Sequence, residues 1–160
     1  MEIKKCIKKS FCVIGKEGST NDGNGFIQKL WEDANGHYSE VSHLAKKNEK
    51  GNPVGYWGAM SDFSRTFNPW DNFSNGLYLA GVEVEDNSEP PINWTEWKIP
   101  AYEYIYIKTE SSDTFSLVRQ YMKENNLHLA GAVHDFICPE ENGQQYMFFP
   151  IKRIFEGEIE

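Results

Sequence analysis

Residues 55–63, which read GYWGAMSDF, and residues 129–137, which read LAGAVHDFI, carry the pattern that decides the fold. Within them, GAMSDF is matched by GAVHDF, and each segment follows an amphipathic stretch and precedes another apolar segment of strand character. A similar local sequence in a similar context favours internal duplication. The chain is therefore predicted to consist of two related halves.

Each half is predicted to have the order β-α-β-β. In the first, a strand over 7–16 leads through a glycine-rich turn into a helix, and strands follow at 55–63 and 77–85. The apolar residues of that helix recur at three- and four-residue spacing and are Phe26, Ile27, Leu30, Trp31 and Ala34.

The second half repeats the order, with a strand over 94–108, a helix, and strands at 129–137 and 145–155. The apolar stripe of its helix consists of Phe115, Val118, Tyr121 and Met122. The proline-bearing segment between the halves suits neither a strand ladder nor a helix. We expect one domain, residues 1–160, made of repeat one at 1–86, a linker at 87–93 and repeat two at 94–160.

These features predict an α+β fold. The two β-α-β-β repeats lie side by side, with antiparallel sheets, helices on one face and a ligand groove between the repeats. Alternation along the strands places Ala80, Val82 and Val84 under the helices and Glu83 on the groove side. Six residues are predicted to bind the ligand: Trp57, Phe63, Glu83, Tyr104, His134 and Phe136.

Composition narrows the class of partner. A net charge of −8 and a pI near 5.0 repel phosphate backbones, and the short lysine pairs, such as Lys8-Lys9, are typical of solvated edges. We predict no direct nucleic acid binding. The sequence has neither an apolar run long enough to span a membrane nor a secretory signal, so we expect a cytoplasmic protein with no membrane contact.

Cofactor and catalytic motifs are not found in the sequence. Three cysteines form no CxxC pair, and four histidines show no metal-binding spacing. We therefore expect no metal, no cofactor and no assignable catalytic residue. The loop from Arg65 to Trp70 is rich in aromatic residues and is interpreted either as a flap over the groove or as a loop pinned to the surface.

Four segments resemble the GyrI-like effector-binding domains, which occur in AraC-type and multidrug-sensing transcription regulators and as free-standing proteins. These segments are YWGAMSDF, YLAGVEVE, WKIPAYEYIYI and YMFFPIKR. The resemblance implies two β-α-β-β repeats and a groove that holds aromatic and cationic molecules with stacked aromatic side chains and buried glutamates. The usual glutamate of the penultimate strand is missing from 133–138, which leaves Glu83, Glu103 and Asp135 as candidates for the acid.

The leading functional prediction is a stand-alone domain that senses or sequesters small amphipathic, aromatic or cationic organic molecules. Because the sequence contains no helix-turn-helix, DNA contact would need another polypeptide. One alternative is a hydrolase that opens cyclopropane rings of DNA-alkylating natural products, with Glu83 or His134 as general base. Another is an interaction protein of the gyrase-inhibitor type. The natural ligand and the oligomeric state stay open.

Overall fold

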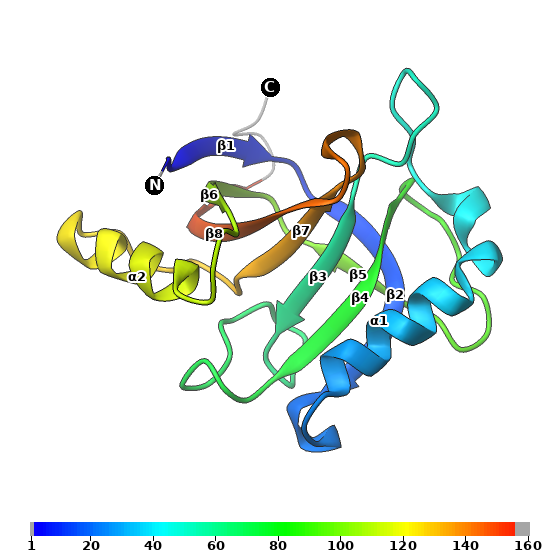
Figure 1. Cartoon of the computed structure of the whole chain (residues 1–160), viewed down its shortest axis with the longest axis horizontal. Helices are drawn as coiled ribbons and strands as arrows, with labels where there is room; N and C mark the ends of the chain where they lie inside the picture. Colours follow the sequence, from blue (N-terminus) through cyan, green and yellow to red (C-terminus); the bar gives the residue numbers. More distant parts are fainter. Residues whose placement is uncertain (1, 156–160) are drawn as a thin grey trace.

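Eight antiparallel strands form a single curled sheet in the computed structural model, which describes residues 2–155, and two helices cover one of its faces (Figure 1). The strands are β1 Lys4–Lys8, β2 Phe11–Ser19, β3 Tyr56–Ser61, β4 Leu77–Val84, β5 Thr95–Ile99, β6 Tyr102–Lys108, β7 His134–Cys138 and β8 Gln144–Arg153. The α-helices are α1 Phe26–Gly36 and α2 Thr114–Glu124, and short 3-10 turns occupy Thr20–Asp22, Tyr38–Glu40, Ser42–Leu44 and Pro139–Glu141.

The strand order shows the duplication directly. The order is β1-β6-β8-β7-β3-β4-β2-β5. If each of β1 to β4 is exchanged for its counterpart among β5 to β8, the same order is obtained, read from the opposite edge of the sheet. The register agrees, because Lys4 lies opposite Tyr106 and the corresponding Thr95 lies opposite Gly15. The predicted α+β fold of two repeats is confirmed, and the repeats are related by an approximate twofold axis through the middle of the sheet.

The opening strand of each half is broken, which corrects the sequence prediction. Residues 94–108 form β5 and β6 rather than one strand, and Pro100, which has no N–H to donate, lies at the break. The predicted strand at 7–16 is likewise replaced by β1 and β2, which are separated at Lys9 and Ser10. After each break the chain changes partner: β1 pairs with β6 and β5 with β2, so each half lends its first strand to the other.

The sequence match between the halves does not relate equivalent positions. Gly58 pairs with Ala80, and Asp135 pairs with the residue equivalent to Ala80 in the second repeat, Met147, so Gly58 corresponds to Asp135 and not to Gly131. Residues 129–133 precede β7 instead of forming part of it, and the Ala132 N–H donates to the Phe67 carbonyl oxygen in a loop. The structure contains two repeats, but GAMSDF and GAVHDF do not occupy equivalent positions in them.

Side-chain alternation sorts the apolar residues into three clusters. One cluster lies on the concave face of the sheet and includes Leu79 and Tyr104. The others lie beneath α1 and α2 on the opposite face. Ala80, Val82 and Val84 belong to the cluster beneath α1, as the alternation predicts. Among residues 2–155, no helix is long and apolar enough to cross a membrane.

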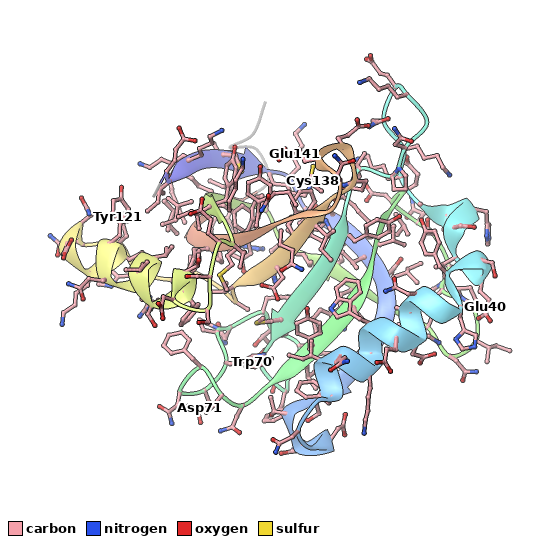
Figure 2. All side chains as sticks on the ribbon, viewed as in Figure 1. Glu40, Trp70, Asp71, Tyr121, Cys138 and Glu141 are labelled. Atoms are coloured by element: carbon pink, nitrogen blue, oxygen red, sulfur yellow. The ribbon has the colours of Figure 1, made fainter. Side chains whose placement is uncertain are left out.

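The loop between β3 and β4 is pinned to both faces of the sheet. Phe67 packs against Trp97 on the concave side, with ring centroids 5.7 Å apart. Trp70 lies on the helix side, where its indole N–H donates to the Leu77 carbonyl oxygen at 2.9 Å (Figure 2). These contacts fit the interpretation of a pinned loop, in which Phe67 closes one end of the concave cluster.

A close approach of two backbones gives a test of the sheet. Gly15 and Gly81 lie opposite each other, and a methyl group on Gly81 would overlap the Ile14 carbonyl oxygen. We expect Gly81→Ala to lower the free energy of unfolding by about 1–3 kcal/mol in urea titrations, because the overlap is with backbone that cannot move aside easily. Gly36→Ala, which points into open space, should change it by less than about 1 kcal/mol. Equal effects of the two substitutions would contradict this packing.

Candidate functional site

A cavity of about 420 Å³ opens on the concave face, between the edge strand β1 and the central strands. Its volume falls within the range of about 300–1,000 Å³ that is usual for small-molecule sites. The lining residues are Lys4, Cys6, Ile7, Lys8, Val54, Trp57, Glu83, Tyr106, Phe136, Glu141, Tyr146 and Phe148. They come from both repeats, as the predicted groove requires.

Five of the twelve residues that line the cavity are aromatic. Trp57 lies directly opposite Phe136 across the β3–β7 pair, and the ring centroids are 4.6 Å apart. Tyr106 lies opposite Phe148 across the β6–β8 pair, and these rings are stacked at 4.9 Å with an interplanar angle of 7°. Because paired residues share one face of a sheet, the register alone brings these side chains to the same side.

The rim is polar. The Tyr146 hydroxyl donates to the Glu141 carboxylate at 2.5 Å, and Glu141 lies in the turn between β7 and β8, which Figure 2 shows beside the labelled Cys138. Lys4 lies on β1 at the same opening. The cavity therefore has an aromatic interior with charged groups of both signs around its mouth.

Glu83 places a carboxylate in the floor of this cavity. The residue lies on β4, is only 3% exposed, and accepts a hydrogen bond at 3.0 Å from the indole N–H of Trp57. The ammonium of Lys8 lies 3.2 Å from each of its carboxylate oxygens. An ionised carboxylate buried this far is costly unless it is paired and hydrogen-bonded, so these two contacts make its position tenable.

The same ammonium also faces aromatic rings. The Lys8 Nζ lies 4.4 Å from the ring centroid of Phe11 and 5.7 Å from that of Trp57, and the side chain is 28% exposed. Both distances are within the range of cation–π attraction. The sequence interpretation of Lys8 as part of a solvated edge is therefore wrong. Its charge is held in the cavity by a carboxylate and two aromatic faces.

The six predicted ligand-binding residues separate into three groups. Trp57, Glu83 and Phe136 line the cavity. Tyr104 and His134 belong to the same side of the sheet but are fully buried. Phe63 lies beyond the end of β3, is 46% exposed and is not among the lining residues.

The two buried members each keep one polar atom without a partner. His134 Nδ1 accepts the Met60 N–H at 3.0 Å, and burial lowers the pKa of His134 to about 3. The imidazole is therefore neutral at physiological pH, with its proton on Nε2. This Nε2 and the Tyr104 hydroxyl have no hydrogen-bond partner among residues 2–155. Two polar groups are thus available beneath the aromatic wall.

The three candidate carboxylates lie on different faces. Glu83 lines the cavity, whereas Glu103 alternates with the concave Tyr104 and so faces the helix side. Asp135 also faces away from the cavity and accepts a hydrogen bond at 3.3 Å from Tyr78, whose hydroxyl accepts the Trp31 indole N–H at 3.0 Å. Glu83 is the only one of the three that a ligand in the cavity could reach.

Sequence reasoning missed several cavity residues. Cys6 and Lys8 belong to β1, which the sequence prediction did not separate from the strand over 7–16, although both alternate with exposed residues as strand residues do. Tyr146 and Phe148 lie two residues apart on β8 and therefore share one face of it. The two-residue spacing of these side chains can be recognised in the sequence. The strand pairing that brings β8 to the groove cannot. No group of His, Cys, Asp and Glu within residues 2–155 is suited to hold a metal ion.

A second hollow, of about 640 Å³, lies on the helix side of the sheet between α2 and the β3–β4 loop. It has an aromatic part around Phe73 and Phe115, and the Arg119 guanidinium lies 4.9 Å from the Phe73 ring centroid. Its lining contains no carboxylate among the described residues. The concave cavity, which combines aromatic walls with a buried charge, is the better candidate for a ligand site.

Comparisons with known proteins identify the fold. No protein-family description and no curated protein sequence matches the chain. Solved structures do match: SAV2435 bound to tetraphenylphosphonium has a TM-score of 0.67 and 12% identity, over 95% of this chain and 94% of that one. EcmrR in a complex with DNA has a TM-score of 0.63 and 10% identity, over 96% of this chain and 58% of that one. A hydrolase from Listeria innocua has a TM-score of 0.56 and 9% identity, over 94% and 92%.

Asp135 gives a pH-dependent test of its burial. Burial raises its pKa to about 6, so the folded protein holds this proton more tightly than the unfolded chain does. The ionised carboxylate therefore destabilises the folded protein. This loss of stability is absent below pH 4, grows as the pH rises to about 6 and is constant above it. We expect Asp135→Asn to be more stable than the wild type by about 1–3 kcal/mol at pH 7 and by nothing at pH 3.5, in urea titrations at both pH values. A gain that is independent of pH would contradict this account.

Proposed function

We propose that this chain is a small-molecule-binding domain of the GyrI-like type, whose concave cavity holds organic cations that carry aromatic groups. The observation that carries the proposal is the buried Glu83 carboxylate, which receives a hydrogen bond from Trp57 in the floor of an aromatic-walled cavity. In the free protein the positive partner of this carboxylate is Lys8, and the surrounding rings favour a ligand cation with an apolar surface.

The energetics suit a ligand of this kind. A cation over an aromatic face gains about 0.5–2 kcal/mol, more when both are desolvated. The apolar part of the ligand adds about 25 cal/mol for each Å² that it buries, which makes shape and burial the main source of affinity. That a protein of the same fold is bound to tetraphenylphosphonium supports the choice of ligand class, and the two unpartnered groups of Tyr104 and His134 could take polar atoms of a ligand that penetrates deeper.

A role in sensing or sequestration follows from the proposal. EcmrR, which is in a complex with DNA, has a matching portion that amounts to 58% of its chain. We infer that the present chain supplies a ligand-binding unit in the cytoplasm, and that it would act either by holding the compound or by presenting it to a separate partner.

The ring-opening hydrolase is a second candidate because a hydrolase is among the structures with this fold. Glu83 is the group that would act as general base, since His134 is fully buried behind the wall. Loss of a cyclopropane-bearing alkylator beyond one equivalent of protein, abolished in Glu83→Gln, would support this activity. Stoichiometric protection of the compound would support binding instead.

The binding proposal is tested by a matched pair of probes. Tetraphenylphosphonium and the neutral triphenylphosphine oxide are titrated against the protein, with tryptophan fluorescence as the readout because Trp57 lines the cavity. We expect Glu83→Gln to weaken binding of the cation by about 5- to 30-fold, which corresponds to about 1–2 kcal/mol, and to leave the neutral probe within about twofold. Glu103→Gln makes the same change of charge on the opposite face and should affect neither probe.

Two results would overturn the proposal. The first is the absence of saturable binding by either probe at concentrations up to the low millimolar range. The second is an equal loss of cation affinity in Glu83→Gln and Glu103→Gln, because that would show a response to net charge and not to the cavity carboxylate.

A further inference from the structure

The cation position of the cavity is already filled by the protein itself. The Lys8 ammonium lies 3.2 Å from both oxygens of Glu83 and 4.4 Å from the ring centroid of Phe11. These are the contacts that the proposed function assigns to a ligand cation. An incoming cation and the Lys8 ammonium therefore compete for one carboxylate.

The position of Lys8 in the fold allows its charge to leave. It is the last residue of β1, directly before the break at Lys9 and Ser10, and within residues 2–155 β1 is an edge strand that pairs with β6 alone. The side chain is 28% exposed, and a lysine has a flexible four-carbon stem. The ammonium can thus move from Glu83 into water by rotation of its side chain, without a change in the sheet.

We propose that Lys8 is a tethered competitor that determines which cations the cavity accepts. This inference rests on the proposed function and specifies the ligand class. In the free protein the Lys8 ammonium neutralises Glu83, and a ligand binds by displacing it. The cavity then selects quaternary and delocalised aromatic cations against primary ammonium ions.

The selectivity follows from hydration. An ammonium group is a compact, strongly hydrated charge, so the displaced Lys8 regains a full hydration shell in water. A quaternary or aryl-substituted cation loses little hydration on entry and adds apolar contact with the aromatic wall. A primary ammonium ligand loses as much hydration free energy on entry as Lys8 regains on leaving. It also forms the same contact with the carboxylate, so replacing Lys8 with such a ligand gives little net free energy.

The competition has a measurable size. When a site is open for only a fraction of the time, the apparent affinity equals the affinity of the open site multiplied by that fraction. If Lys8 occupies the site about 90% of the time, its removal improves cation affinity about tenfold. The gain should depend on the positive charge of the ligand, because a neutral aromatic compound does not need the carboxylate.

The first experiment compares Lys8→Met with Lys5→Met, which removes the same charge from the exposed opposite side of β1. The probes are the phosphonium cation used above and the pair benzyltrimethylammonium and benzylammonium. We expect Lys8→Met to bind the phosphonium about tenfold more tightly than the wild type does. The ratio of its affinities for benzyltrimethylammonium and benzylammonium should be smaller than that of the wild type. Lys5→Met should match the wild type within twofold. Unchanged or weaker phosphonium binding in Lys8→Met would overturn the inference while leaving the proposed function intact.

The second experiment uses the wild-type protein, since loss of Lys8 leaves a buried carboxylate without its partner. Reductive methylation is followed residue by residue by mass spectrometry. We expect Lys8 to react slowly in the free protein and faster at saturation with the phosphonium, while Lys5 reacts equally in both. A Lys8 rate that stays constant or falls on saturation would overturn the inference. If neither the wild type nor Lys8→Met binds any probe, the proposed function fails and this inference fails with it.

Discussion

The carboxylate of Glu83 is the group on which the arrangement of the concave face depends. A charge that is 3% exposed must be compensated inside the protein, and the compensation comes from the Trp57 indole and the Lys8 ammonium. Lys8 reaches Glu83 because β1 leaves its own repeat and pairs with β6 of the other. The exchange of first strands, which looks like a detail of topology, therefore provides the positive charge of the site.

The repeats have diverged at the positions that matter for chemistry. Glu83 pairs with Val13 in one repeat, and at the corresponding place in the other Pro150 pairs with Tyr104. In the same way Trp57 lies opposite Gly81, where the other repeat has His134 opposite Phe148. One half of the groove thus supplies the carboxylate and the other a bulkier aromatic wall. The duplication produced a symmetric scaffold that carries a single, asymmetric charged site.

The sequence predicts which face of a strand each side chain occupies, but it does not predict which strands pair with one another. A period of two correctly placed Glu83 on the concave side and Val82 beneath α1, because alternation is a local property. Pairing is a long-range property, so the break at Pro100 and the partner of β1 were missed, and Lys8 with them. How deeply a side chain is buried on its face of the sheet also depends on residues far away in the sequence. Tyr104 and His134 therefore lie behind the wall that Trp57 and Phe136 present to the cavity.

Strand β1 has a further consequence for the behaviour of the sheet in solution. As the outermost strand on one side it carries backbone groups that could pair with a second copy of the chain, and such edges promote aggregation unless they are protected. Its sequence, KKCIK, places lysines on both of its faces, and lysine at an edge opposes the approach of an identical edge through charge repulsion and loss of hydration. The strand that brings a cation to the groove thereby also limits growth of the sheet by edge-to-edge addition.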